Sequence, residues 1–173
     1  MEHTGNDLIR ILSIDLCNRG VGFVVLESPY KLVDWGVKQA ARRVDDQEIS
    51  RAEELIRHYR PHVVTVEDVD HPMCRRGPRA RRITKLIEEL ALKRDTRVYR
   101  CDPHKLNEAF ADMGARTKRQ VAAAVALRLP PLIRHLPPVR KPWMSEDPRT
   151  SIFDAASYAM TFLRERSRDV ASN

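Results

Sequence analysis

The chain has 173 residues, of which 42% are hydrophobic, so it suits one globular domain with a proper core rather than two domains. A formal net charge of +7 favours a polyanionic partner, although a solvated basic surface accounts for it equally well. Three cysteines, Cys17, Cys74 and Cys101, lie far apart without a C-x-x-C pair, which argues against a disulfide framework and against a zinc site.

The N-terminal half predicts three strands followed by a helix and a fourth strand. The predicted strands are 8–16, 21–27, 31–37 and 62–67, and the predicted helix is 45–59. Short connections, the tight turn Asn18-Arg19-Gly20 and the break at Ser28-Pro29, make the first three strands antiparallel neighbours. The fourth strand is short and apolar on both faces, which is typical of a central strand.

The C-terminal half adds one strand and is otherwise helical. A helix is predicted over 78–94, a fifth strand over 96–101, and further helices over 103–111, 118–129 and 150–165. Residues 166–173 are expected to form a frayed polar tail, which leaves residues 1–165 as a single domain. The expected fold is therefore α/β: a five-stranded mixed sheet, with three antiparallel strands plus two parallel ones, flanked by helices.

No segment predicts insertion into a membrane. The first ten residues are polar and lack the apolar region of a signal peptide. The longest apolar stretch, 121–133, is interrupted by Arg128 and by two prolines, so it cannot span a bilayer. We therefore expect a soluble cytoplasmic protein without a membrane partner.

Two strands that a strand–helix–strand crossover would place side by side each carry an acid near the carboxyl end. These acids are Asp15 on the first strand and Glu67 at the end of the fourth. Because neighbouring strands lie about 4.8 Å apart, two carboxylates at one level would repel strongly, so they would either raise a pKa or hold a divalent cation. The alternatives are a turn residue for Asp15 and a solvated strand end for Glu67.

A third acid, Asp154, lies among small apolar residues at the start of the last helix, where a carboxylate is costly unless it is capped, paired or bound to metal. Glu146 and Asp147 precede it in a loop, and either could simply belong to the cap of that helix. Three or four carboxylates that converge at the end of a sheet indicate a two-metal phosphodiesterase site. Oxygen ligands of this kind suit two Mg²⁺ or Mn²⁺ ions.

An arginine-rich stretch follows the fourth strand within a few positions. Its members are Arg75, Arg76, Arg79, Arg81 and Arg82. Cations so close to the predicted carboxylates are expected to grip phosphates and to deliver a nucleic-acid backbone to the site. Asp68, next to Glu67, is expected to face away as an ordinary strand-end acid.

The segments ILSIDL with Asp15, VVTVED with Glu67 and IFDAASYAM with Asp154 resemble the three carboxylate motifs of RuvC-type Holliday junction resolvases. GARTKRQVAAAV, residues 114–125, is similar to the resolvase segment in which a glycine and a lysine precede a helix. The resemblance spans about residues 8–163. Each motif alone is weak, whereas their order and spacing together are fairly specific.

The resemblance implies the ribonuclease H-like fold and a metal-dependent, structure-selective DNA endonuclease. Asp15, Glu67 and Asp154 would be metal ligands, and Lys118 would lie near the scissile phosphate or the junction backbone, with Arg119 as a further contact to nucleic acid. The alternative for Lys118 is an exposed lysine in the first turn of a helix. The implied partners are a four-way DNA junction and a second copy of the chain, since these resolvases cut two strands symmetrically as homodimers.

The chain departs from the resolvase pattern at the fourth ligand. Resolvases commonly carry an acid or a histidine three residues before the final aspartate, and this position is Ser151 here. Either Asp147, which we favour slightly, or Glu146 supplies the fourth ligand, or the site has three acids.

The departure leaves two alternatives to a junction-cleaving enzyme. One is a nucleic-acid-binding protein of the same fold that has lost cleavage, and the other is a ribonuclease H-like nuclease that acts on RNA or RNA–DNA hybrids. A sugar-kinase or actin-like ATPase shares the strand order, but the sequence has six glycines and no glycine-rich phosphate loop.

Overall fold

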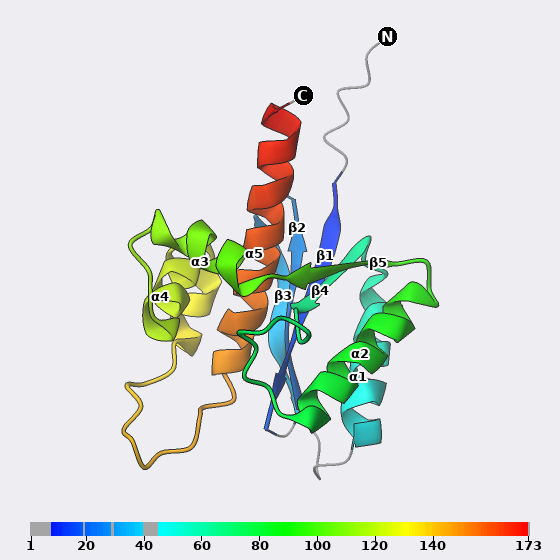
Figure 1. Ribbon diagram of the computed structural model, residues 1–173, viewed down its shortest axis with the longest axis horizontal. Helices are drawn as coiled ribbons and strands as arrows, with labels where there is room; N and C mark the ends of the chain where they lie inside the picture. The colour runs from blue at the N-terminus through cyan, green and yellow to red at the C-terminus, as the bar shows by residue number, and fades with distance from the viewer. Residues whose placement is uncertain (1–7, 19, 29, 40–44, 173) are drawn as a thin grey trace.

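The computed structural model describes residues 8–18, 20–28, 30–39 and 45–172, which form a five-stranded sheet with helices on both faces (Figure 1). The strands are β1 (Arg10–Cys17), β2 (Gly20–Glu27), β3 (Lys31–Gln39), β4 (Val63–Glu67) and β5 (Arg97–Cys101). Their order in the sheet is β3-β2-β1-β4-β5, with antiparallel pairing from β3 to β1 and parallel pairing from β1 to β5. The predicted mixed α/β sheet is therefore confirmed, while Arg19 and Pro29 of the two predicted connections lie outside the described residues.

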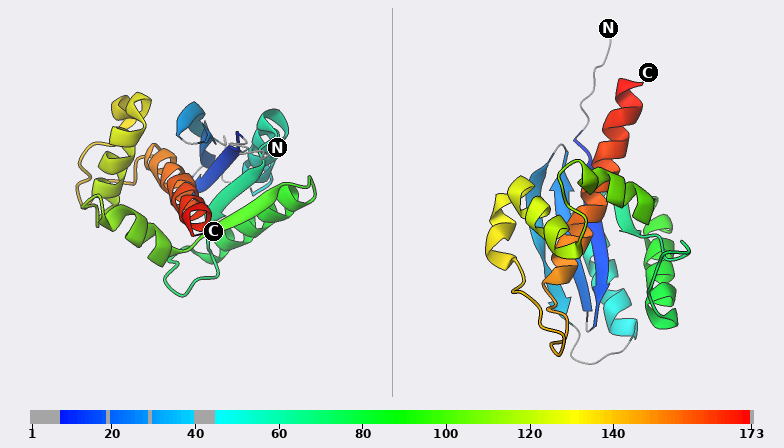
Figure 2. Two further views of the ribbon diagram at one scale, coloured as in Figure 1. Left: turned by 90° about the horizontal axis from the view of Figure 1, so that it is seen from above. Right: turned by 60° about the vertical axis from the view of Figure 1, so that its left-hand side comes forward.

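The helices are α1 (Asp45–Tyr59), α2 (Pro78–Leu92), α3 (Pro103–Ala111), α4 (Lys118–Arg128) and α5 (Thr150–Ala171), with a 3₁₀ segment over Pro130–His135. Helices α1 and α2 cover one face of the sheet, and α5, with α3 and α4 outside it, covers the other (Figures 1 and 2). Within the described residues, no helix combines the length and the apolar character needed to cross a membrane.

Alternation along the strands divides the core between the two faces. On β1, Leu12 and Ile14 pack towards α1 and α2, whereas Ile11 packs towards α5. On β4, Val64 and Val66 belong to the first face and Val63 to the second. Position 15 therefore continues the row of Ile11, and position 67 continues the row of Val63, so Asp15 and Glu67 both lie on the face that α5 covers.

Polar contacts and one glycine fix the position of α5 on the sheet. Ser13 of β1 donates a hydrogen bond to the carbonyl of Ala155 at 2.5 Å and accepts one from Thr65 of β4 at 2.6 Å, and both side chains are buried. Gly22 of β2 packs directly on the first turn of α5, where a Cβ atom would lie 2.2 Å from Oγ and 2.6 Å from the carbonyl carbon of Ser151. The first turns of α5 are thus held against β1, β4 and β2.

Most strand and helix ends lie within two residues of the predicted positions, and the C-terminal helix differs most. Helix α2 ends at Leu92 rather than at residue 94. Helix α5 continues to Ala171, so the prediction of a frayed polar tail from residue 166 was wrong for residues 166–171. A helix whose first turns are packed can extend into solvent, because propagation is far cheaper than nucleation.

Candidate functional site

The predicted pair of carboxylates meets at the carboxyl ends of β1 and β4. Asp15 is 4% exposed and Glu67 is half-buried, and both face the first turns of α5. Tyr158 of α5 is buried and donates a hydrogen bond from its hydroxyl to Oδ1 of Asp15 at 2.9 Å. Asp15 is therefore a buried acid that Tyr158 holds in one orientation. It is not a turn residue, which was the alternative interpretation.

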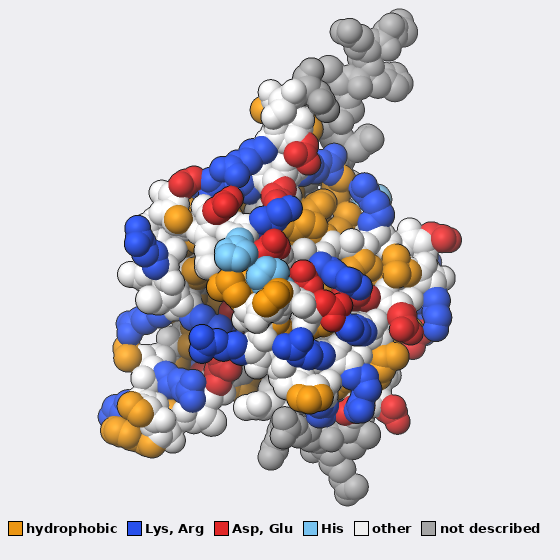
Figure 3. Space-filling view, in the orientation of Figure 1, with side chains coloured by type: hydrophobic (Ala, Val, Ile, Leu, Met, Phe, Trp, Pro, Cys, Tyr) orange, Lys and Arg blue, Asp and Glu red, His pale blue; other side chains and the backbone are white. Residues whose placement is uncertain are grey.

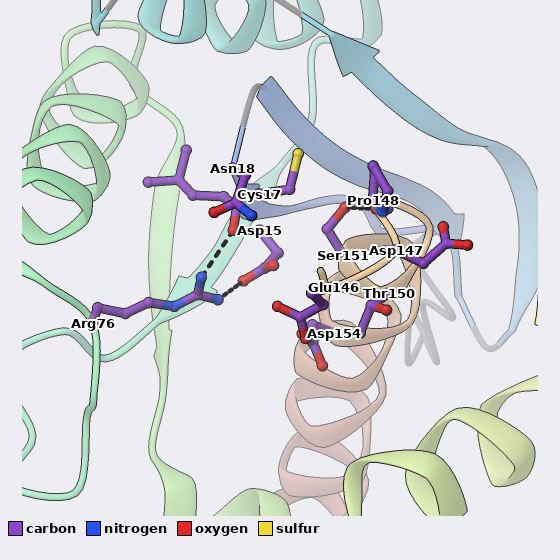
Figure 4. A pocket seen from close by; sticks show the side chains of 11 residues that line it. Asp15, Cys17, Asn18, Arg76, Glu146, Asp147, Pro148, Thr150, Ser151 and Asp154 are labelled. Carbon is purple, nitrogen blue, oxygen red and sulfur yellow. Dashed lines mark hydrogen bonds and ion pairs between the residues drawn. The ribbon is translucent and has the colours of Figure 1, made fainter. Parts of the chain in front are cut away.

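Arg76 bridges these two acids, and Figure 4 shows its guanidinium beside Asp15. Its Nη2 donates to Oδ1 of Asp15 at 2.5 Å, and its Nε donates to Oε2 of Glu67 at 2.6 Å. Its Nη1 donates to the carbonyl of Leu16 at 2.8 Å, so the guanidinium is bonded on three sides. Charge-assisted hydrogen bonds of this kind are short and strong.

The third predicted acid, Asp154, faces the same site from the second turn of α5. Lys118, at the start of α4, lies 3.0 Å from Oδ2 of Asp154 and 3.5 Å from Oε1 of Glu146. A capping box between Thr117 and Gln120 fixes this helix start. Lys118 therefore reaches the carboxylates and is not merely an exposed lysine in a first turn.

The two loop acids differ in direction. Asp147 points away from the cluster and forms an ion pair with Arg149 at 2.6 Å, which holds the pKa of its carboxyl below the usual range (Figure 4). Both acids line a cleft with Asp15 and Asp154, and Glu146 also approaches Lys118 at 3.5 Å. The geometry therefore favours Glu146 over Asp147, while the identity of a fourth metal ligand stays a prediction.

Ser151 is the residue at the position where resolvases commonly have the fourth ligand. It is buried against Gly22, and its hydroxyl donates to the carbonyl of Pro148 at 2.6 Å. Its short side chain lets β2 and α5 approach closely, so a packing requirement accounts for a small residue here.

Burial raises the pKa of Asp15 to about 7, in spite of the opposing charge of Arg76, and the nearby acids Asp154 and Glu67 add to the increase. Burial also raises the pKa of Asp154, against the opposing charge of Lys118. The pKa of the buried Tyr158 hydroxyl is raised by burial as well, so this group remains a proton donor. Buried acids with raised pKa values in a cleft are a frequent mark of a functional site, because additional positive charge there is strongly favoured.

The donor set fits a hard divalent cation, because carboxylate oxygens are the ligands that Mg²⁺ and Mn²⁺ prefer. Within the part of the chain that the structure describes, no three acidic, histidine or cysteine side chains are gathered closely enough to hold an ion. Arg76 separates Asp15 from Glu67, and Lys118 bridges Asp154 and Glu146. A divalent ion would have to replace one of these protein cations.

The arginine-rich stretch was expected to grip phosphates, but most of its members make ion pairs or hydrogen bonds within the protein. Arg79 pairs with Asp45 at 2.7 Å and with the buried Glu48 at 2.5 Å, and Arg82 pairs with Asp45. Arg81 donates to the carbonyls of Val69, Cys74 and Arg76. These side chains join α2 to α1 and fix the loop before α2, so their positive charge is committed within the protein.

Arg75 differs from the other four arginines. It is exposed, and within the described residues its guanidinium makes no hydrogen bond or ion pair. It lines a groove that starts at Glu67 and Asp154, together with Arg116 and Lys118. Apolar side chains form part of the same groove: Met73, Leu106 and Val121. A groove lined by both cationic and apolar side chains suits a nucleic-acid strand, whose phosphates are charged and whose bases have flat faces that stack.

Acidic side chains are interspersed among the lysine and arginine side chains over the face seen in Figure 3, so the basic surface is not a uniform patch. Arg119, expected to contact nucleic acid, is exposed at the start of α4 but does not line the groove.

Sequence reasoning missed Tyr158 and Arg116. Tyr158 lies four residues after Asp154, a spacing that puts both on one helix face and could have indicated it.

Comparisons with solved structures show the fold of the chain. The Thermus thermophilus RuvC structure is 19% identical, with a TM-score of 0.64 over 92% of this chain and 96% of that chain. T. thermophilus RuvC in complex with a Holliday junction substrate gives a TM-score of 0.61 at the same identity and coverage. The yeast mitochondrial Holliday junction resolvase Ydc2 is 13% identical, with a TM-score of 0.56 over 92% of this chain and 80% of that one.

No protein-family model matches the sequence, and no curated protein matches it. At these identities the structural likeness defines an architecture and no activity. The chain has the ribonuclease H-like fold, in the form found in these resolvases.

Proposed function

We propose that the chain is a divalent-metal-dependent DNA endonuclease of the Holliday junction resolvase type. One observation carries the proposal: acids from β1, β4, α5 and the loop before α5 converge at one end of the sheet, although they lie as far apart in the sequence as Asp15 and Asp154. The fold shared with resolvases of known structure supports the same conclusion.

In this proposal Asp15, Glu67, Asp154 and Glu146 hold two Mg²⁺ or Mn²⁺ ions. Such ions would polarise the scissile phosphate and lower the pKa of a bound water. Tyr158 keeps Asp15 in its orientation through the 2.9 Å hydrogen bond. Lys118, which the ions would release from Asp154 and Glu146, is then free to bind a phosphate oxygen of the substrate.

The proposed substrate is a four-way DNA junction, bound along the groove beside the site. Its rim carries Arg75, Arg116 and Lys118, and Arg119 extends the positive charge beyond it. A symmetric pair of cuts requires two equal active sites, so the proposed active form is a homodimer.

A binding protein without cleavage activity is the second candidate. Two features favour it: Ser151 stands at the position of the usual fourth ligand, and each pair of acids already binds a protein cation, Arg76 or Lys118. Such a protein would bind junctions equally well in chelator and would cut none of them in any divalent metal.

The test is incubation of the protein with an end-labelled four-way junction in Mg²⁺, in Mn²⁺ and in chelator, with a linear duplex and an RNA–DNA hybrid as competing substrates. We expect metal-dependent nicking of the junction by the wild type and none by Asp154→Asn. Glu54→Gln, which removes an exposed acid of α1, is the matched control and should cut normally. Preferred cutting of the hybrid would instead indicate a ribonuclease, and unchanged nicking by Asp154→Asn would refute the proposed site.

A further inference from the structure

The guanidinium of Arg76 occupies the place between Asp15 and Glu67 where an ion bound to both would lie. Three of its nitrogen atoms make hydrogen bonds of 2.5–2.8 Å, two of them to the carboxylates and one to the carbonyl of Leu16. Its side chain is 27% exposed, whereas that of Lys118 at the neighbouring acids is 67% exposed. Arg76 is thus the more firmly held of the two cations in the cluster.

The backbone that carries Arg76 is fixed independently of the acids. Arg81, in the first turn of α2, donates to the carbonyl of Arg76 at 2.9 Å and to those of Val69 and Cys74 at 2.7 and 2.8 Å. Pro78 at the start of α2 stiffens the chain two residues later. The loop can therefore keep its shape while the long side chain of Arg76 changes rotamer.

There is also a place for the side chain to move to. Arg76 and Glu67 both line the groove beside the site, which is open to solvent and also contains Arg75. Rotation about the side-chain torsions would carry the guanidinium from the acids into this groove, where a substrate phosphate would provide a new bidentate partner.

We infer that Arg76 is a built-in counter-ion, which occupies the Asp15–Glu67 position in the metal-free protein and must leave it when a divalent ion binds. This inference rests on the proposed function, since it concerns the same carboxylates. It follows that the protein binds divalent metal more weakly than its four acids alone would, and that removing the charge of Arg76 tightens binding.

The test is the affinity for Mn²⁺ without DNA, measured by titration calorimetry and by the paramagnetic resonance signal of free Mn²⁺. We expect Arg76→Gln to bind Mn²⁺ on the order of tenfold more tightly than the wild type, the change expected from losing a charged competitor that is hydrogen-bonded to two ligands. Arg76→Lys keeps the positive charge but loses the forked guanidinium, so its Mn²⁺ affinity should lie between those of the wild type and Arg76→Gln.

Arg79→Gln is the matched control. Arg79 also pairs with two acids, Asp45 and Glu48, but these lie in α1 outside the cluster, so its loss should leave Mn²⁺ affinity unchanged. Both variants should have a lower melting temperature in chelator. Saturating Mn²⁺ should restore the melting temperature of Arg76→Gln only, because the ion replaces the lost positive charge there.

Equal or weaker Mn²⁺ binding by Arg76→Gln would overturn the inference, and so would failure of this variant to fold in saturating Mn²⁺. If either result is found and the wild type still cleaves junctions, the inference alone is wrong and the proposed function stands. If neither protein binds Mn²⁺, the proposed metal site is wrong as well.

Discussion

Asparagine in place of Asp15 should stabilise the metal-free protein above pH 7, although it removes a side chain from the proposed active site. Burial raises the pKa of Asp15 to about 7 from the ordinary value of 3.8, so the folded state holds this proton more tightly than the unfolded state does. Stability therefore falls as the pH rises from 3.8 to 7, and the full cost is present above pH 7.

The size of the effect follows from the difference between the pKa of Asp15 in the folded protein and its ordinary pKa. A carboxyl whose pKa is about 7 instead of 3.8 costs the folded state on the order of 4 kcal/mol when it is ionised. Asp15→Asn resembles the protonated acid at every pH and can still accept the hydrogen bond of Tyr158. For a chain of this length the gain corresponds to a rise in melting temperature of roughly 8–16 °C at pH 8.

The measurement is urea unfolding in chelator at several values from pH 4 to pH 8, followed by circular dichroism. The variant and the wild type should be almost equally stable at pH 4. The free energy of unfolding of the variant should then rise steadily above that of the wild type up to pH 8. Asp112→Asn, which removes an exposed acid at the end of α3, controls for the loss of a carboxylate as such. A variant no more stable than the wild type at pH 8, or a gain that grows towards low pH, would refute the reasoning.

Four further substitutions test the packing of α5 and the different surroundings of the arginines. Gly22→Ala should lower the free energy of unfolding by about 2–3 kcal/mol, measured in urea, because its methyl group would meet the backbone of α5; an unchanged midpoint would contradict the close contact. Ser13→Ala should cost about 1–3 kcal/mol in the same assay, since it leaves the buried hydroxyl of Thr65 without its acceptor. Arg75→Ala should reduce the slope of log DNA affinity against log salt concentration by about one, whereas Arg82→Ala should leave this slope unchanged. Equal effects of the two substitutions would contradict the different surroundings of these arginines.

The sheet and the three acids of the site could be predicted because they depend on local patterns. The alternating direction of side chains on β1 and β4 places Asp15 and Glu67 on one face, and the parallel pairing of these strands brings their carboxyl ends together. The small apolar residues around Asp154 marked a carboxylate that needs a partner, and α5 packs these residues on the sheet and places Asp154 beside Lys118. These features follow from the two-residue period of strands and the 3.6-residue period of helices.

The partners of the arginines could not be predicted, because they depend on which distant acids the fold brings near. Arg79 binds Asp45 and Glu48, more than 30 residues upstream, only because α1 and α2 pack side by side. The direction of Asp147 was missed for a local reason. Its ion pair with Arg149, two residues later, turns it away from the cluster and leaves Glu146 beside Lys118.

The most direct test of the central claim is anomalous diffraction from crystals of the protein grown or soaked in Mn²⁺. The account predicts manganese peaks at about 2.1 Å from carboxylate oxygens of Asp15 and Asp154, with the side chain of Arg76 turned into the neighbouring groove. Absence of manganese from the four acids at saturating concentration, with Arg76 still bonded to Asp15 and Glu67, would contradict it.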